Sequence, residues 1–441
     1  MTLNQMQAAD NNVSKFYHVN VIGLGFVGLP TAALLANAGH TVRGIDIDRI
    51  LLETLNKGAS PIQEEEVAKQ VERALSGARF VVSSIVSKAD VHIICVPTPL
   101  ADDKTADLSM VQAAIESMVH EVKKGDLILL ESTSPIGTTD TLLAGILRDH
   151  GFDPEKDLDI CYCPERVFPG STISEIVENN RVVGGLTPQA STRARQFYAS
   201  FCQGEITETS ARAAEFSKLM ENTFRDVNIA LANSFAKIAE QAEIDVHNVI
   251  ELANRHPRVN VHTPGPGVGG HCIPVDPWFL IAGYPEQAAL LKHAREINMG
   301  QASHLIDRAI DSGLSPKSKI ALLGSAYRGD IEDTRESPTW IFVKTLQDRG
   351  FSVSLYDPLA STSDPHINKD IDVRNSVESA VESADAVFIL TDHSIFKFLR
   401  PQDFAKMKGR LILDTRRIIR SENFVNNGFN VVEVGAPNLS K

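Results

Sequence analysis

A thiol, an imidazole and a carboxylate lie close together in one glycine-rich loop. Residues 267–272 are Gly-Val-Gly-Gly-His-Cys, and Asp276 follows four residues after the cysteine. Glycine lets backbone N–H groups approach a reacting centre, and a cysteine becomes nucleophilic where a base or a cation favours its thiolate. The loop therefore predicts Cys272 as a nucleophile with Asp276 beside it. His271 by itself is more typical of a loop histidine hydrogen-bonded to a backbone carbonyl.

The other four cysteines fit structural roles. Cys95, Cys161, Cys163 and Cys202 lie in or beside apolar segments. The Cys161-x-Cys163 pair has no second Cys/His pair at zinc-like spacing, so we expect no metal site. An odd, dispersed set of five cysteines also fits a reducing compartment better than a disulfide framework.

A second group of residues fits dinucleotide binding. The G-x-G-x-x-G run follows a strand pattern and opens a helix pattern; it consists of Gly23, Leu24, Gly25, Phe26, Val27 and Gly28. Such glycines allow a tight turn, backbone approach to a pyrophosphate and close helix–strand packing. Asp46 ends the next strand 18 residues after Gly28, near the spacing of a ribose-binding acid, which favours NAD over NADP. Arg43 and Arg49 lie nearby, and we expect them to be solvated.

Two later strand ends are expected to complete the nicotinamide half of this site. Pro97 and Thr98 follow one apolar run, and Ser132 and Thr133 follow another. Because ligands bind beyond the carboxyl ends of parallel strands, these loops are placed to supply backbone and hydroxyl contacts. Ordinary strand-end turns would give the same pattern, so the spacing leaves both interpretations open.

Alternating strand and helix patterns predict an α/β fold that positions these residues. One series of apolar strand patterns lies at 18–25, 41–48, 91–97 and 126–133, and a second lies at 318–327, 351–358, 385–393 and 410–418. Near-continuous apolar runs separated by helices are typical of doubly wound parallel sheets. The two series share this pattern without an obvious sequence repeat.

Between the two series, residues 211–244 have helical periodicity without glycine or proline, and a further helical stretch spans about 285–311. The fold class we predict is two Rossmann-like doubly wound parallel sheets joined by a long central helix. The expected domains are an NAD-binding domain at 1–205, a central helical domain with the catalytic loop at 206–312, and a second Rossmann-like domain at 313–441.

Composition narrows the class of protein. The 441 residues, 43% hydrophobic and 22% charged, are ordinary for a multidomain globular protein. A net charge of −13 argues against a nucleic-acid partner, because duplex binding needs a basic surface. No apolar run approaches the ~20 residues of a membrane helix, and the polar N-terminus has no signal-peptide pattern. We therefore expect a cytoplasmic protein that binds neither nucleic acid nor membrane.

Taken in order, these motifs resemble the nucleotide-sugar 6-dehydrogenases, the family that includes UDP-glucose 6-dehydrogenase. The resemblance covers nearly all of the chain after about residue 18. It rests on Gly23-x-Gly25-x-x-Gly28, Val96-Pro97-Thr98-Pro99, Ser132-Thr133-x-Pro135-x-Gly137-Thr138, Pro164-Glu165, Glu215-x-x-Lys218-x-x-x-Asn222, Cys272-x-x-x-Asp276 and Asp333-Thr334-Arg335-Glu336-Ser337. It implies an NAD-dependent, four-electron oxidation of a sugar 6-hydroxyl to a carboxylate, through a thiohemiacetal and a thioester on Cys272.

The resemblance also implies roles for single residues. Lys218 would stabilise the developing oxyanion, with Asn222 one helical turn away on the same face. Asp276 would position or activate water, Thr133 would hold that water, and Glu165 would assist as a base. The implied substrate contacts are Arg166, Lys218, Asn222, Arg225, Arg258, His271, Tyr327, Arg328 and Arg416.

Arginine is suited to the substrate diphosphate because it donates in a bidentate fork. The resemblance assigns this contact to Arg328, and it implies that Arg258 reaches the substrate of a neighbouring subunit. Arg335 and Arg416 are expected near the domain interface or the cofactor phosphates, although each is also compatible with a structural ion pair. The long helix would form the core of a homodimer or a higher homo-oligomer.

Departures from the UDP-glucose pattern point to another substrate. Pro169 stands where that branch has a second glutamate, His271 replaces a serine and Val275 replaces a lysine. Gly265-Pro266-Gly267-Val268-Gly269-Gly270-His271-Cys272, Pro164-Glu165-Arg166, Thr391-Asp392-His393 and His256-Pro257-Arg258-Val259-Asn260 look like the branch that acts on N-acetylated sugars. The implied substrate is UDP-N-acetyl-D-mannosamine, for surface polysaccharide synthesis. UDP-N-acetylglucosamine and UDP-glucose are the alternatives.

Two other classes of protein share part of this pattern. A two-electron β-hydroxyacid dehydrogenase needs neither Cys272 nor a second Rossmann-like half. A non-catalytic nucleotide-sugar-binding protein has no need of Lys218, Cys272 and Asp276. The presence of these features favours the four-electron dehydrogenase over both.

Overall fold

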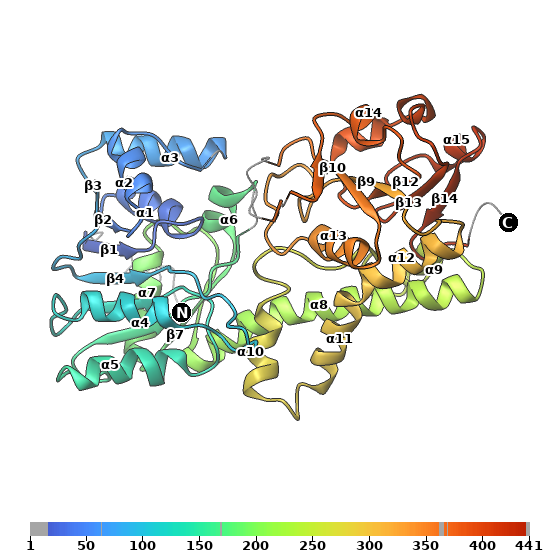
Figure 1. Cartoon of the computed structure of the whole chain (residues 1–441). Coiled ribbons are helices and arrows are strands. Elements are labelled where there is room, and N and C mark those ends of the chain that lie inside the picture. Colours follow the sequence, from blue (N-terminus) through green and yellow to red (C-terminus); the bar gives the residue numbers. More distant parts are fainter. Residues whose placement is uncertain (1–15, 63, 168–169, 361–365, 368, 438–441) are drawn as a thin grey trace, which may run out of the picture. The chain divides into compact units, whose positions relative to one another are not determined.

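The computed structural model describes residues 16–62, 64–167, 170–360, 366–367 and 369–437 (Figure 1). The chain forms two compact units that divide after Met220. Each unit is built around its own mainly parallel sheet. The units are described one at a time.

The first unit contains an eight-stranded sheet with the order β3-β2-β1-β4-β5-β6-β7-β8. The strands are β1 (His18–Ile22), β2 (Thr41–Ile45), β3 (Phe80–Ser83), β4 (Val91–Ile94), β5 (Leu127–Leu130), β6 (Asp159–Tyr162), β7 (Arg181–Gly185) and β8 (Ile206–Ser210). Neighbouring strands run parallel except β6 and β7, which pair antiparallel. In the register of the centre, Val21 of β1 lies opposite Gly44 and Ile93.

Helices cover both faces of this sheet, as its continuous apolar strands require. One hydrophobic core packs the sheet against α1 (Gly28–Asn37), α2 (Arg49–Asn56), α3 (Glu65–Ser76) and α7 (Pro188–Tyr198). The other packs it against α4 (Ser109–Met118), a π-helical turn (Thr139–Leu143), α5 (Ala144–Asp149) and the start of α8. The short helix α6 (Thr172–Glu178) contacts α3 and α1.

The long helix α8 (Ala211–Gln241) has 31 residues and leads from β8 of the first unit into the second unit. It confirms the prediction of an unbroken helix from residue 211. The predicted stretch 285–311 is instead two helices, α11 (Ala289–Met299) and α12 (Gln301–Asp311). Gly300 lies at their junction, where the absence of a side chain weakens helix continuation.

The second unit contains a six-stranded parallel sheet with the order β11-β10-β9-β12-β13-β14. The strands are β9 (Lys319–Leu323), β10 (Ser352–Tyr356), β11 (Ile371–Val373), β12 (Ala386–Ile389), β13 (Leu411–Asp414) and β14 (Asn430–Glu433). One core packs the sheet against the end of α8, α9 (Val246–Ala253), α12 and α13 (Pro338–Asp348). The opposite core includes α14 (Val377–Ala380), two 3₁₀ turns (Ser394–Phe398 and Pro401–Phe404) and α15 (Ser421–Val425).

The two sheets share a strand order that the sequence does not reveal as a repeat. The order β3-β2-β1-β4-β5-β6 of the first sheet recurs as β11-β10-β9-β12-β13-β14 in the second. Even the turn after the central strand recurs: Gly23 N donates to Ile45 O and Gly324 N to Tyr356 O, both at 2.8 Å. This confirms the predicted fold of two Rossmann-like sheets and a long helix.

Candidate active site

The glycine loop between β1 and α1 leaves open space at one position. A Cβ on Gly23 would lie 2.8 Å from the Cys95 carbonyl oxygen, and one on Gly28 would lie 1.9 Å from the Gly23 oxygen. A Cβ on Gly25 would meet no atom within 4 Å. Gly23 and Gly28 must therefore be glycine, because a Cβ at either position would clash with a backbone oxygen of the protein. The middle glycine leaves room for a pyrophosphate at the N-terminus of α1, beside the half-buried Phe26 and Val27.

Asp46 follows β2 and faces the same loop. Its Oδ2 accepts a hydrogen bond from Leu24 N at 2.8 Å, and its Oδ1 accepts one from Asp48 N at 2.9 Å. A carboxylate has about four acceptor sites, so both oxygens keep capacity for ribose hydroxyls. The glycine loop and Asp46 together fit the adenosine half of NAD.

The loops after β4 and β5 are tied to each other by their hydroxyl groups. Thr98 Oγ1 donates to Thr133 O at 2.6 Å, and Ser132 Oγ donates to Val96 O at 2.7 Å. Pro97 is exposed, and the Thr133 side chain is half-buried. Since the hydroxyl protons of Thr98 and Ser132 are used within the protein, these two groups remain available to a cofactor as acceptors.

Glu165 belongs to a buried charge network with Arg181 and Glu131. Its Oε2 accepts from Arg181 Nη2 at 3.0 Å, and its Oε1 accepts from Arg166 N at 2.8 Å. Arg181 Nη1 lies 3.8 Å from Glu131 Oε1, and the guanidinium lies 4.7 Å from the Tyr198 ring centre. Burial works against the Arg181 charge, but Glu165 and its anionic neighbours outweigh burial and raise the pKa of Arg181.

Glu131 is the second carboxylate of this network. Its Oε1 accepts from Tyr198 Oη at 2.5 Å and its Oε2 from Cys95 Sγ at 3.2 Å. Burial raises the pKa of Glu131, and the Arg181 charge opposes the rise. Burial also raises the pKa of Cys163 to about 12. Burial likewise raises the pKa of Cys95. The thiols of Cys95 and Cys163 are therefore protonated at neutral pH and are not nucleophiles.

Helix α8 contributes Lys218 and Glu215 to the first unit. Lys218 is 8% exposed, and its Nζ donates to Glu165 O at 2.8 Å. One turn earlier, the fully buried Glu215 accepts from Gly137 N at 2.5 Å and from Thr139 N at 2.8 Å. The helix is thus fastened to the loop after β5 and to the Glu165 segment. An ammonium group fixed in this way is a stationary donor for a developing negative charge.

In the second unit, Asn222 holds the carboxylate that follows the cysteine loop. Asn222 Nδ2 donates to Asp276 Oδ2 at 2.5 Å, and both side chains are buried. Asp276 begins α10 (Asp276–Gly283), and its backbone N–H donates to Cys272 O at 2.8 Å. The thiol and the carboxylate therefore lie one turn apart on a backbone fixed to α8.

The cysteine loop packs against the segment between β9 and α13. Gly270 N donates to Arg335 O at 3.0 Å, and a Cβ on Gly269 would lie 2.5 Å from Tyr327 Cβ. Burial lowers the pKa of Arg225, and the charge of Cys272 opposes that shift. Cys272 is half-buried. Arg225, Tyr327 and Arg335 lie close enough to the thiol to interact with it electrostatically.

The predicted arginines differ in what surrounds them. Arg335 donates to both oxygens of Asp333, at 2.9 and 2.6 Å, so the structure contains an ion pair of the kind that the sequence allowed. Arg416 donates to the backbone oxygens of Leu390 and Tyr327, at 3.0 and 3.3 Å. Arg328 is half-buried at the carboxyl end of β9.

The remaining predicted residues lie on more open surfaces. Arg166 is half-buried and donates to Asn180 O at 3.2 Å. Arg258 is exposed in the segment after α9, and His271 is exposed beside Cys272. Pro169 lies outside the described residues.

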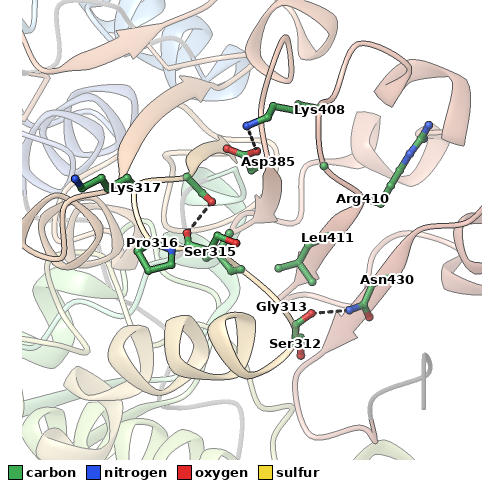
Figure 2. Close-up of a pocket in the computed structure, with 13 residues that line it drawn as sticks. Ser312, Gly313, Ser315, Pro316, Lys317, Asp385, Lys408, Arg410, Leu411 and Asn430 are labelled. Atoms are coloured by element: carbon green, nitrogen blue, oxygen red, sulfur yellow. Dashed lines mark hydrogen bonds and ion pairs between the residues drawn. The ribbon is translucent and has the colours of Figure 1, made fainter.

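A cavity of about 460 Å³ in the second unit does not coincide with these residues (Figure 2). It lies at the amino ends of β9, β12, β13 and β14, where Lys408 pairs with Asp385 at 3.0 Å and Asn430 Nδ2 donates to Ser312 O. Ligands of parallel sheets bind at the opposite, carboxyl ends. Among the residues that the structure describes, no His/Cys/Asp/Glu group is arranged to hold a metal ion. Over the same ranges, no helix is long and apolar enough to cross a membrane.

Two supporting residues, Arg181 and Tyr198, were missed from the sequence, and the buried ion-pair role of Glu131 was not predicted. Arg181 opens the strand Arg-Val-Val-Gly-Gly, and Glu131 follows Leu-Ile-Leu-Leu. A charge at the end of an otherwise apolar strand is a signal for a buried pair. It does not identify the partner, because the network joins residues 95, 131, 163, 165, 181 and 198.

Sequence profiles of one family match three consecutive parts of the chain. Within the UDP-glucose/GDP-mannose dehydrogenase family, the NAD binding domain matches residues 17–202, the central domain 212–300 and the UDP binding domain 321–421. A UDP-N-acetyl-D-mannosamine dehydrogenase of Methanococcus aeolicus is 41% identical to this chain, and the match covers 94% of this chain and 94% of that protein.

Solved structures agree with this comparison. A UDP-D-ManNAc dehydrogenase from Pyrococcus horikoshii has a TM-score of 0.87 and 39% identity, and the match covers 95% of this chain and 99% of that chain. A UDP-N-acetyl-mannosamine dehydrogenase from Staphylococcus aureus has a TM-score of 0.83 and 41% identity, and the match covers 95% and 98% of the two chains.

Proposed function

The chain belongs to the UDP-glucose/GDP-mannose dehydrogenase family, and from this premise we propose that it oxidises the C6 hydroxyl of UDP-N-acetyl-D-mannosamine to a carboxylate. The observation that carries the four-electron reaction is the Cys272 loop, whose Asp276 is fixed by Asn222 at 2.5 Å. The choice of sugar is supported by relatives named for UDP-N-acetyl-D-mannosamine at about 40% identity. The product would serve surface polysaccharide synthesis.

NAD is the cofactor of this family's N-terminal domain, and the first unit fits it. The open space at Gly25 and the free acceptor capacity of Asp46 suit the pyrophosphate and the adenosine ribose. Pro97, Thr98, Ser132, Thr133 and Arg335 are proposed as further contacts. When bound, NAD supplies the acceptor for the hydride that leaves C6.

Lys218 is proposed to stabilise negative charge on the C6 oxygen. Its Nζ keeps two donors beyond the one given to Glu165 O. As the hydroxyl loses its proton, an ammonium group already fixed in place stabilises the alkoxide without reorganising. Glu165 is proposed to assist as a base and Thr133 to hold a water, while Asn222 lies one turn further along α8.

Cys272 is proposed to make the second oxidation possible. An aldehyde has no hydride to release until a nucleophile adds, so the thiolate attacks C6 and the carbonyl oxygen takes a proton to give a thiohemiacetal. Loss of a hydride from C6 and of the hydroxyl proton then gives a thioester. Water, positioned by Asp276, adds to the thioester and the Cys272 thiolate leaves, which releases the carboxylate and restores the thiol site.

The substrate's nucleotide is proposed to bind the second unit, whose sheet matches the family's UDP binding domain. Tyr327 and Arg328 at the carboxyl end of β9, with Arg225 and Arg416, are proposed to contact the UDP-sugar. Arg166 and His271 are proposed at its sugar end, and Arg258 toward a neighbouring subunit. The division into domains 1–205, 206–312 and 313–441 is part of the same proposal.

We further propose a homodimer built on α8 and a cytoplasmic location. The helix exposes a stripe of large apolar side chains, of which Phe224 is 61% and Ile238 60% exposed. A stripe of this kind is typical of a surface covered by another protein. The remaining members are Phe216, Met220, Leu231 and Phe235.

The test is the number of NADH molecules formed per sugar. Purified enzyme with limiting UDP-N-acetyl-D-mannosamine should yield two NADH, and a yield of one would refute the thioester route. Cys272→Ser should abolish turnover, whereas the control Cys202→Ala should keep the stoichiometry. Values of kcat/KM for UDP-N-acetylglucosamine, UDP-N-acetylgalactosamine and UDP-glucose, each with NAD and NADP, decide the sugar and the cofactor.

A further inference from the structure

The loop after β9, residues 324–330, contains Tyr327 and Arg328, and its backbone is hydrogen-bonded on both sides of these two residues. Gly324 has φ +96°, and a Cβ there would lie 2.3 Å from Thr391 Cβ. Thr391 Oγ1 donates to Ala326 O at 2.6 Å, and Gly329 N donates to Asp392 Oδ1 at 2.9 Å. The segment after β12 therefore holds the loop from one side.

Asp357, at the end of β10, holds the same loop from the other side. Its Oδ2 accepts from Ser325 N at 2.6 Å and from Ala326 N at 3.1 Å. Its Oδ1 accepts from Leu359 N and Ala360 N, each at 2.9 Å. Burial favours the neutral acid, but the hydrogen bonds from His393 and the backbone outweigh burial and lower the pKa of Asp357.

His393 connects Asp357 to the far end of the loop. The fully buried ring places Nε2 3.0 Å from Asp357 Oδ2 and Nδ1 3.0 Å from Asp330 N. The backbone N–H of Asp330 is a donor, so Nδ1 is the acceptor and Nε2 carries the proton given to Asp357. Asp330 has φ +61°, a left-handed conformation that a non-glycine residue keeps only where its surroundings fix it.

Asp46 occupies the position in the first sheet that Asp357 occupies in the second, but the two carboxylates differ in their hydrogen bonds. Asp46 also follows the second strand of its sheet and binds the backbone after the central strand, but from the described part of the chain it accepts two backbone N–H groups. Asp357 accepts four backbone N–H groups and an imidazole. Its acceptor sites are filled by the protein, so no ribose hydroxyl can use them.

We propose that Asp357 and His393 form a loop clamp, which fixes Tyr327 and Arg328 in position for the diphosphate of the UDP-sugar. In this sheet the carboxylate after the second strand holds the protein loop, whereas Asp46 at the equivalent position of the other sheet is proposed to bind a ribose. Asp357 and His393 are positioning residues, because they act through the loop. The inference rests on the proposed function, which places the nucleotide of the substrate at this loop.

The test uses two conservative variants of His393 in the full-length enzyme. His393→Asn keeps an acceptor near Nδ1 for Asp330 N, and His393→Gln keeps a donor near Nε2 for Asp357, so each retains one of the two bonds. Each should raise the Kd for UDP about tenfold in calorimetry, as the loss of about one hydrogen bond and of loop order predicts. The Kd for NADH should change less than about twofold in both variants. In the control His293→Gln, which alters a surface histidine, the Kd for UDP and the Kd for NADH should each change less than about twofold.

Hydrogen exchange separates positioning from general stability. Amides of residues 325–330 should exchange faster in both variants, while those of β9 and β12 keep their wild-type protection. Uniformly faster exchange throughout the unit, or an unchanged Kd for UDP, would overturn the clamp while leaving the proposed function intact. A wild-type enzyme that fails to bind UDP would overturn both.

Discussion

Removing Arg181 tests whether the buried charge network stabilises the first unit. Arg181 is 5% exposed and pairs with both Glu131, at 3.8 Å, and Glu165, at 3.0 Å. In Arg181→Met, both carboxylates remain buried without their counter-charge. The variant is therefore expected to lose stability because an uncompensated charge is left behind, beyond the packing that is lost.

The size of the effect follows from these contacts. Breaking a buried pair by removing one partner costs about 3–5 kcal/mol. Glu131 keeps Tyr198 Oη at 2.5 Å and Cys95 Sγ at 3.2 Å, and Glu165 keeps Arg166 N at 2.8 Å, so we expect the lower end, about 3 kcal/mol. With a urea slope of about 3 kcal/mol per molar, the midpoint should fall by about 1 M.

Urea unfolding followed by two signals measures this change. Both tryptophans, Trp278 and Trp340, belong to the second unit, so their fluorescence reports that unit while circular dichroism reports both. The dichroism midpoint should fall by about 1 M and the fluorescence midpoint by less. The control Arg195→Met breaks an exposed pair with Glu208 and should cost at most about 1 kcal/mol. A wild-type midpoint in Arg181→Met would refute the reasoning.

The loss should also depend on pH. Burial raises the folded-state pKa of Glu131, so its contribution to stability is present at low pH and is lost as pH rises through that pKa. Without Arg181 the pKa rises further. The deficit of Arg181→Met should therefore be larger at about pH 8 than at about pH 5.5, and an equal or opposite difference would contradict the role given to Glu131.

Three further changes test other parts of the structure. Gly28→Ala places a Cβ 1.9 Å from Gly23 O and should abolish NADH binding in a fluorescence titration, whereas Gly145→Ala, with nothing within 4 Å, should leave it intact. Asp46→Asn should lower the NAD-to-NADP ratio of kcat/KM by about tenfold, because a repelling charge is removed; an unchanged ratio would count against its ribose contact. Phe224→Glu should convert the proposed dimer to monomer in light scattering, and an unchanged mass would exclude α8 as the interface.

The sequence predicted those elements whose conformation depends only on residues close together in the chain. The glycine fingerprint, Asp46 and the long α8 pattern predicted β1, α1 and a helix from residue 211, because backbone conformation and helical periodicity act over a few residues. The prediction of one helical stretch over 285–311 was wrong, because helical periodicity does not reveal the break at Gly300 between α11 and α12.

The sequence by itself determined the alternation of strands and helices, and it supplied Cys272, Lys218 and Asp276 as candidate reacting residues. Only the tertiary structure decided which side chains meet. It pairs Arg181 with Glu131 and Glu165. It fills the acceptor sites of Asp357 with protein donors, whereas Asp46 keeps acceptor capacity for a ligand. It also shows that the two sheets share one strand order. Contacts between residues far apart in the chain depend on how whole elements pack, and no local pattern of residues records that packing.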